Sequence, residues 1–350
     1  MTTLPPRITA GVDTHLDVHV TAALDAHGAL LDVASFETTA AGYTALLDWL
    51  RSFGEVELVG VEGTGSYGAG LTRHLLAEGV RVVEVDRPNR QRRRRRGKSD
   101  PQDAISAARA AQSGDATGQA KTRDGNVESM RVLRVARNSA RSARTQCLNQ
   151  MRSLISTAPE AIRAELRDLN VYRLLERTRA YRPGQKRDVT SLTKFTLRTL
   201  ARRAIALQDE VADLDAILDP LVADTAPELL GRLGLGVETT SALLVAAGDN
   251  PERLRNEATF AHLCGASPLD ASSGKQQRHR LNRGGDRQAN SALWKIVITR
   301  MVYDPTTRDY IDRRIKEGLT KKEAIRCLKR YIAREVYNHL PRAQLALDGP

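Results

Sequence analysis

The sequence is poor in aromatic residues and cysteine, and it lacks long apolar runs. Phe, Trp and Tyr together make up only 4% of the chain, which argues against a protein that binds single-stranded nucleic acid by stacking bases. The cysteines Cys147, Cys264 and Cys327 have neither CxxC spacing nor an even count, so we expect reduced core thiols in a cytoplasmic protein. No stretch approaches the roughly 20 apolar residues of a membrane-spanning helix, and no signal peptide is evident. We therefore expect no membrane partner.

Positive charge, in contrast, is abundant. The 350 residues include 54 Lys and Arg against 42 Asp and Glu, which gives a formal net charge of +12. Such an excess indicates a polyanionic partner, and nucleic acid is the commonest one. The length suffices for two or three domains. We expect an α/β domain at 1–117, a helical coiled-coil region at 118–226 and a mainly helical domain at 227–350.

The first third of the chain alternates strand and helix patterns. The expected strands span 8–12, 18–24, 30–36, 56–61 and 80–85. Helical spacing at 40–53 and 67–78 predicts two helices, and Ser99-Asp100-Pro101 is typical of the start of a third. The resulting order, βββαβαβα, belongs to the ribonuclease H-like fold, in which the first and fourth strands lie side by side at the centre of the sheet.

Carboxylates occur at the positions where this fold would bring them together. Asp13 ends the first strand and Glu62 ends the fourth, while Asp100 and Asp103 are three residues apart and share one helix face. Four oxygen ligands suit Mg²⁺ or Mn²⁺, and two such ions can activate the attacking oxygen and stabilise the leaving one in phosphoryl transfer. Each acid alone is equally well explained as a cap, a turn or a strand end, so the metal site is predicted from their joint placement.

A basic run immediately precedes the helix of Asp100. It consists of Arg92, Arg93, Arg94, Arg95 and Arg96, followed by Lys98. We expect a loop that contacts phosphate, and a solvated charge run is the alternative. His15 and His19 flank Asp13 but lack a metal-binding partner pattern, so they are assigned no role.

A sugar-kinase interpretation competes for the same region. Gly11-Val12-Asp13 followed by 25–28 resembles the phosphate-binding hairpin of sugar kinases, whose actin-like fold shares this strand order. Those enzymes need further glycine-rich nucleotide motifs in a second half, and none is present here. The basic charge balance also counts against them.

The middle of the chain has two helical repeats. Leu133, Ala140, Cys147 and Leu154 recur every seven residues, and apolar residues at 197–218 alternate three and four apart until Pro220 stops the pattern. Together they predict a coiled-coil hairpin with its turn at 181–187, which is either an intramolecular arm or a dimer contact. A neighbouring face is expected to be solvated, with nucleic-acid contact as the alternative; it carries Arg134, Arg137, Arg141 and Arg144.

Two features of the C-terminal third suggest contact with DNA. Residues 233–237, Leu-Gly-Leu-Gly-Val, form a glycine turn between helices, either a helix-hairpin-helix that holds a backbone phosphate or a plain helical hairpin. Ser273 precedes Gly274 in a loop crowded with cations, where it could attack phosphate. A serine-glycine pair is also a common turn. The cations are Lys275, Arg278, Arg280 and Arg283.

Together these motifs resemble a known family. Asp13, Glu62 and residues 98–104, Lys-Ser-Asp-Pro-Gln-Asp-Ala, resemble the DEDD tetrad of insertion-sequence transposases with a RuvC-like N-terminal domain, the family that includes the Piv-type DNA invertases. Residues 265–268, Gly-Ala-Ser-Pro, with Ser273-Gly274 and Arg283-Gly284-Gly285, resemble the signature of that family's C-terminal transposase domain.

The resemblance implies an RNA-guided DNA recombinase. In the recombinases of that family the two domains assemble one composite site. By this resemblance the four acids would hold Mg²⁺ and Ser273 would attack DNA. The adjacent Ser272 is the alternative, and Ser273 is preferred because the family's serine precedes a glycine. A structured bridge RNA from the same element pairs with donor and target DNA, which leaves the protein to hold backbone. In the family the coiled coil joins protomers, so we expect dimers that pair into a tetramer. We expect the protein to associate with the bacterial nucleoid.

Two other functions stay open. A RuvC-like structure-selective nuclease would use the same acids to direct water at phosphate, with no covalent intermediate. A non-catalytic nucleic-acid-binding protein would carry the acids only incidentally. A serine substitution separates the first from the recombinase, and removal of the acids separates the second.

Overall fold

The computed structural model describes residues 5–85, 99–184, 186–270 and 279–341. The chain divides into two compact units. Unit 1 contains the chain up to Gly125 together with Ala247–Thr259, and unit 2 contains Asn126–Ala246 and Phe260–Pro341. The division into three domains at 117 and 226 stays a prediction. Within the described ranges no helix is both long and apolar enough to cross a membrane.

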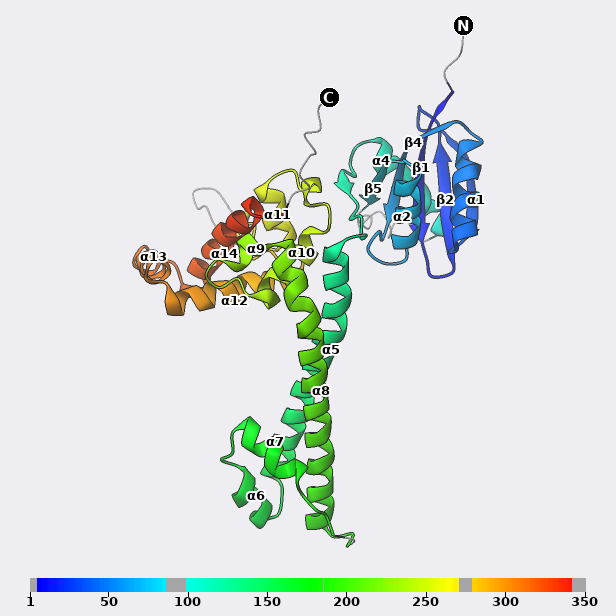
Figure 1. The fold of residues 1–350 in the computed structure, drawn as a ribbon. Helices are drawn as coiled ribbons and strands as arrows, with labels where there is room; N and C mark the ends of the chain where they lie inside the picture. Colours follow the sequence, from blue (N-terminus) through cyan, green and yellow to red (C-terminus); the bar gives the residue numbers. More distant parts are fainter. Residues whose placement is uncertain (1–4, 86–98, 185, 271–278, 342–350) are drawn as a thin grey trace. The chain divides into compact units, whose positions relative to one another are not determined.

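Unit 1 is built on a mixed sheet with strand order β3-β2-β1-β4-β5-β6 (Figure 1). β1 pairs antiparallel with β2 and parallel with β4, so the predicted adjacency of the first and fourth strands is confirmed. This topology is compatible with the expected ribonuclease H-like fold. The strands are β1 Arg7–Thr14, β2 Val18–Leu24, β3 Leu30–Glu37, β4 Glu55–Glu62, β5 Val82–Val85 and β6 Gly118–Gln119.

Helices cover both faces of this sheet. Val12 of β1 packs in one core cluster with Leu46 of α1 and Leu71 of α2, whereas Ala22 of β2 packs with Ala104 of α4 on the other face. Because side chains alternate along a strand, the odd-numbered residues of β1 face α4. The helices are α1 Ala40–Arg51, α2 Ala69–Ala77 and α4 Asp100–Gln112.

Two glycines let α4 lie directly on the sheet. A Cβ on Gly11 would lie 2.0 Å from the main-chain nitrogen of Ala108, and one on Gly60 would lie 2.8 Å from the carbonyl oxygen of Ala107. Any larger residue would therefore push the helix away from β1 and β4. The small residues of α4 complete this close backbone contact, and they fix where its first turn lies.

Unit 2 contains two long antiparallel helices, α5 (Asn126–Ser156) and α8 (Val189–Thr225), which lie side by side (Figure 1). The Arg144 guanidinium donates a 2.7 Å hydrogen bond to Gln208 across the pair. The predicted long helices are therefore present, while a coiled coil in the strict sense stays a prediction. α8 continues through Pro220, because a proline removes one helical hydrogen bond without always ending the helix.

The connection between α5 and α8 is more than the predicted turn. It contains α6 (Glu160–Leu166) and α7 (Val171–Arg179). Leu174 of α7 packs in one apolar cluster with Met151 of α5 and Leu197 of α8. These short helices therefore close the far end of the pair with their own small core.

The C-terminal part of the chain is mainly helical. Its longest helices are α12 and α14, and α13 lies between them in the sequence. Gly234 has φ +85° in the turn between α9 and α10, a conformation that favours glycine. The remaining elements are α9 Pro227–Leu230, α10 Val237–Ala247, η1 Pro251–Arg253, α11 Glu257–Leu263, β7 Leu269–Asp270, β8 His279–Arg280, α12 Arg287–Tyr303, α13 Pro305–Lys316 and α14 Lys321–Asn338.

Candidate active site

Asp13 and Glu62 lie at the ends of two neighbouring parallel strands. The register pairs Val12 with Val61, so the acids that follow them are next to each other on the α4 face. The Thr14 hydroxyl donates a 2.8 Å hydrogen bond to the carbonyl oxygen of Glu62, which ties the two strand ends together. The Asp13 and Glu62 residues are only 6% and 7% exposed. The sheet therefore places two buried carboxylates at one edge of unit 1.

The start of α4 adds the other two acids. Ser99 has extended backbone angles and occupies the predicted N-cap position, and Pro101 follows in the first turn. Asp103 is 6% exposed, whereas Asp100 is half-buried. The helix dipole favours negative charge at this end, so the first turn of α4 is a suitable place for two acidic side chains.

His15 is a site residue that sequence reasoning missed. Its Nε2 lies 3.3 Å from Asp100 Oδ1 and 3.7 Å from Asp13 Oδ2. Its Nδ1 donates to the Thr14 carbonyl at 2.8 Å, which leaves Nε2 to face the carboxylates. The pKa of His15 is raised, first by that backbone hydrogen bond and then by the charges of Asp13 and Asp100. The missed signal was its position two residues after Asp13, directly beyond the end of β1.

The donor atoms fit a divalent cation. The ligand atoms of Asp13, His15 and Asp100 all lie within 4.8 Å of one another among the described residues. Glu62 and Asp103 do not belong to that closest group, but their buried side chains lie on the elements that flank it. Carboxylate oxygens are the ligands that Mg²⁺ and Mn²⁺ prefer, and imidazole is a common additional ligand for metals.

Several predicted site residues lie outside the described residues. These are Arg92, Arg93, Arg94, Arg95, Arg96, Lys98, Ser273, Lys275 and Arg278. Arg280, in β8, and Arg283 are described and exposed, and both belong to unit 2, whereas the acids belong to unit 1. Their contact with nucleic acid stays a prediction.

The glycine motifs at 265–268 and 283–285 of unit 2 form one structural element. A Cβ on Gly285 would lie 2.6 Å from the main-chain nitrogen of Gly265, so the chain segments touch through their backbones. The Asn290 side-chain amide donates to the carbonyl oxygens of Cys264 and Gly265 at 2.8 and 3.0 Å. Lys329 donates in turn to Asn290 Oδ1 at 2.5 Å. Burial lowers the pKa of the Lys329 ammonium.

A short antiparallel pair extends from this element. Leu269 of β7 pairs with Arg280 of β8, so the strands bracket the interval 271–278 that contains Ser273.

The arginines of α5 correct the expectation of a solvated face. Arg134 and Arg137 are only 4% and 9% exposed. Arg137 forms ion pairs with Asp215 of α8 and Glu238 of α10. The expectation was wrong for these two because their partners are remote in sequence, and burial of a guanidinium requires such partners.

Comparisons with known proteins agree on one family across both units. A transposase model of the DEDD IS110 type matches residues 10–159, and a model described as the transposase IS116/IS110/IS902 family matches residues 228–312. Together they cover the four acids and both glycine motifs.

Two curated relatives are similar over part of the chain. An uncharacterized 43.6 kDa protein of insertion element IS110 from Streptomyces coelicolor is 30% identical over 144 residues, 40% of this chain and 35% of the relative. An uncharacterized 42 kDa protein of insertion element IS900 from Mycobacterium paratuberculosis is 26% identical over 151 residues, 42% of this chain and 37% of the relative. The match thus spans little more than a third of either relative.

Proposed function

Because this chain belongs to the IS110 family of transposases, we propose that it cuts and rejoins DNA strands to move its own insertion sequence. One observation carries the proposal: buried Asp13 and Glu62 end adjacent parallel strands, facing the helix that starts at Asp100. Converging carboxylates of this kind are what metal-dependent phosphoryl transfer needs.

The four acids are proposed as the metal ligands, with Mg²⁺ or Mn²⁺ as the cation. Once bound, such an ion would offset the negative charge of the scissile phosphate and of the leaving oxygen. Asp13 and Glu62 hold fixed positions because their strands are paired, while Asp100 and Asp103 are placed by the contact of α4 with Gly11 and Gly60. The hydrogen bond from Nδ1 to the Thr14 carbonyl orients the His15 ring, so its Nε2 lies beside Asp13 and Asp100.

Ser273 is proposed as the nucleophile. Its Oγ would attack phosphorus and lose its proton as the Oγ–P bond forms, and the bond from phosphorus to one deoxyribose oxygen would break as that oxygen takes up a proton. Guanidinium and ammonium groups stabilise the charge that develops on the phosphate oxygens. The proposed phosphate contacts are Arg92, Arg93, Arg94, Arg95, Arg96, Lys98, Lys275, Arg278, Arg280 and Arg283.

A structured non-coding RNA is proposed as the guide to donor and target DNA. The net charge of +12 suits a protein that holds RNA and two DNA duplexes at once. Base pairing would then choose the sites, while the protein binds backbone. The long α5–α8 pair is proposed to join protomers into dimers that pair as a tetramer. The turn between Gly234 and Gly236 is proposed as a helix-hairpin-helix contact to a DNA phosphate.

A covalent-adduct experiment tests the serine step. Donor DNA, target DNA, RNA from the flanking element and Mg²⁺ are incubated with wild type, Ser273→Ala, Ser272→Ala and Asp103→Asn, and products are separated on a denaturing gel. We expect a protein–DNA adduct with wild type and Ser272→Ala, and none with Ser273→Ala or Asp103→Asn. Strand cleavage without an adduct in any sample would assign the alternative function, a nuclease that uses water.

A further inference from the structure

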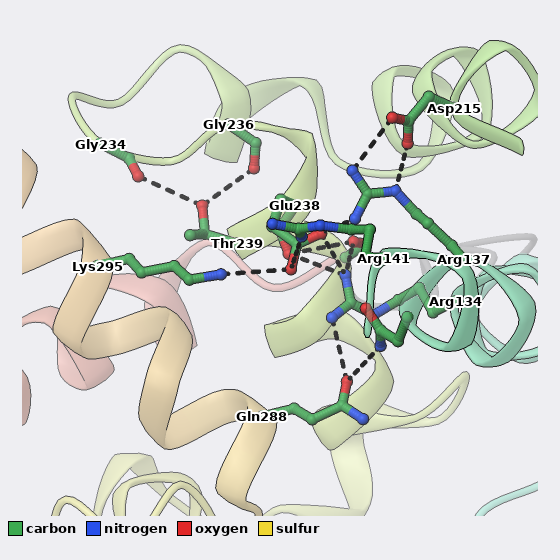
Figure 2. A network of polar contacts seen from close by, with 12 residues as sticks. Arg134, Arg137, Arg141, Asp215, Gly234, Gly236, Glu238, Thr239, Gln288 and Lys295 are labelled. Atoms are coloured by element: carbon green, nitrogen blue, oxygen red, sulfur yellow. Dashed lines mark hydrogen bonds and ion pairs between the residues drawn. The ribbon is translucent and has the colours of Figure 1, made fainter. Parts of the chain in front are cut away.

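A cleft of about 610 Å³ with several charged side chains in its lining lies in unit 2 between α5, α10 and α12. Its lining includes the cationic side chains of Arg134, Arg141, Arg287 and Lys295 and one carboxylate, that of Glu238. Figure 2 shows Glu238 among Arg134, Arg141 and Lys295, with Arg137 turned toward Asp215. We propose that this cleft binds a phosphate of a nucleic-acid backbone.

The floor of the cleft is the buried guanidinium of Arg134, and Arg137, which does not line the cleft, shares the Glu238 carboxylate with it. The Arg134 guanidinium donates to the Glu238 carbonyl oxygen at 2.9 Å, to Ser241 Oγ at 2.6 Å and to Gln288 Oε1 at 3.1 Å. Arg137 is bound by both Asp215 and Glu238. Neither guanidinium is free to turn away, so the positive field at the floor is preorganised and costs no further ordering when an anion arrives.

The rim differs, because its cations are exposed and loosely held. Arg141 Nη1 and Lys295 Nζ each lie 3.5 Å from Glu238 Oε1, and their side chains are 47% and 42% exposed. Exposed pairs of this length are weak, so either group can leave Glu238 and reach an incoming oxygen. Arg287, also exposed, stands in the first turn of α12, whose N-terminal dipole adds to the positive field.

The charge balance leaves the cleft positive. The single carboxylate of Glu238 lies at ion-pair distance from four cations, which are Arg134, Arg137, Arg141 and Lys295. The additional acids are Asp215, which is taken up by Arg137, and Asp286, which acts on Arg134 electrostatically. Burial lowers the pKa of the Arg134 guanidinium, the neighbouring charges of Arg137 and Arg141 lower it further, and the charges of Glu238 and Asp286 oppose them. A bound anion would supply the missing negative charge.

Phosphodiester is the anion that fits best. The neutral groups along the cleft, among them Asn138 and Gln288, are hydrogen-bond donors that suit unesterified phosphate oxygens as well as they suit water. The choice of nucleic acid over another phosphate rests on the proposed function. DNA and RNA share this chemistry, and the experiment below separates them.

Fluorescence anisotropy with the full-length chain tests the cleft. The probes are a labelled DNA duplex and a labelled structured RNA, each titrated at several salt concentrations. The proteins are wild type, the double variant Arg141→Gln/Lys295→Gln and a control, Arg152→Gln, which removes an exposed charge elsewhere on α5. Circular dichroism checks that all three are folded.

We expect the double variant to bind about tenfold more weakly and to show a salt slope smaller by about one to two, because backbone contacts are lost without sequence preference. A loss on the DNA probe only, or on the RNA probe only, assigns the cleft to that strand. A double variant that matches Arg152→Gln in affinity and slope on both probes overturns the cleft while leaving the proposed function intact. Wild type that binds neither probe overturns both.

Discussion

The Thr14 hydroxyl lies 2.8 Å from the carbonyl oxygen of Glu62 and donates a buried hydrogen bond to it. This bond joins β1 to β4 beyond Val12 and Val61, the last residues paired between these two strands. It therefore helps to fix the positions of Asp13 and Glu62 relative to each other on the face that α4 covers. The spacing of the two carboxylates depends on this contact as much as on the strands.

Thr14→Val is expected to separate the two strand ends. The substitution keeps the side-chain shape but leaves the buried Glu62 carbonyl without this donor, which should lower the free energy of unfolding by about 1 kcal/mol. Mn²⁺ binding, measured by isothermal titration calorimetry, should weaken as well. Thr14→Ser keeps the donor and serves as the control. Equal Mn²⁺ affinity in the Val and Ser variants would contradict this role.

Gly11→Ala is expected to displace α4. The added Cβ would meet the main chain of Ala108 at 2.0 Å and that of Ala104 at 2.3 Å, and backbone cannot rotate aside as a side chain can. We expect the free energy of unfolding to fall by about 3 kcal/mol, at the upper end of overpacking costs. Urea denaturation measures this loss. Gly118→Ala, where the nearest atoms lie at 3.7 Å, should change stability little; similar losses in both variants would rule out the proposed tight contact.

Glu238→Gln is expected to destabilise unit 2. The change removes the carboxylate shared by Arg134 and Arg137, whose side chains are only 5% and 11% exposed. An uncompensated buried charge costs several kcal/mol, and partial exposure of Glu238 reduces this to about 2 kcal/mol. Thermal unfolding should show a lower stability for Glu238→Gln than for Glu210→Gln, which changes an exposed residue of α8 and serves as the control. A stability equal to that control would mean that Asp215 alone compensates both arginines.

Stability should fall in acid partly through Glu335. Burial alone would raise the pKa of this carboxyl, but hydrogen bonds and charges from Arg300 and Arg232 outweigh it and lower the pKa. A lowered pKa means that the contribution of Glu335 is present above the usual glutamate range and is lost as pH falls through the lowered value. Urea unfolding between about pH 5 and pH 3 should show a shallower decline for Glu335→Gln than for wild type. Parallel curves would exclude this contribution.

The sequence was sufficient for most of unit 1. Strand and helix periods are local properties, and they predicted β2 with its observed bounds and the start of α4 after Ser99. Strand order then placed Asp13 beside Glu62, because the positions of carboxylates at strand ends follow from topology alone. The close approach at Gly11 and Gly60 was not predicted, since a glycine in a strand does not reveal which backbone lies over it.

The failures concern contacts between remote segments. Arg134 and Arg137 carry no local mark of burial, because their partners Asp215 and Glu238 lie on other helices. The link from Asn290 to Gly265 is also long-range, although both residues lie in or beside recognised motifs. His15 could have been found from its spacing to Asp13. Long-range pairing decided these cases, and periodicity does not encode it.

Mg²⁺-dependent donor-DNA cleavage by wild type and Asp13→Asn, with Mn²⁺ binding measured on the same preparations, tests whether the acids of unit 1 form a catalytic metal site. We predict that Asp13→Asn remains folded, binds Mn²⁺ at least tenfold more weakly and loses cleavage by at least about a hundredfold, because the lost carboxylate helps to hold the cation that stabilises charge at the reacting phosphate. Asp25→Asn, at a half-buried turn residue just after the end of β2, should behave as wild type. Cleavage by Asp13→Asn at the wild-type rate would contradict the metal site and, with it, the assignment of catalysis to unit 1.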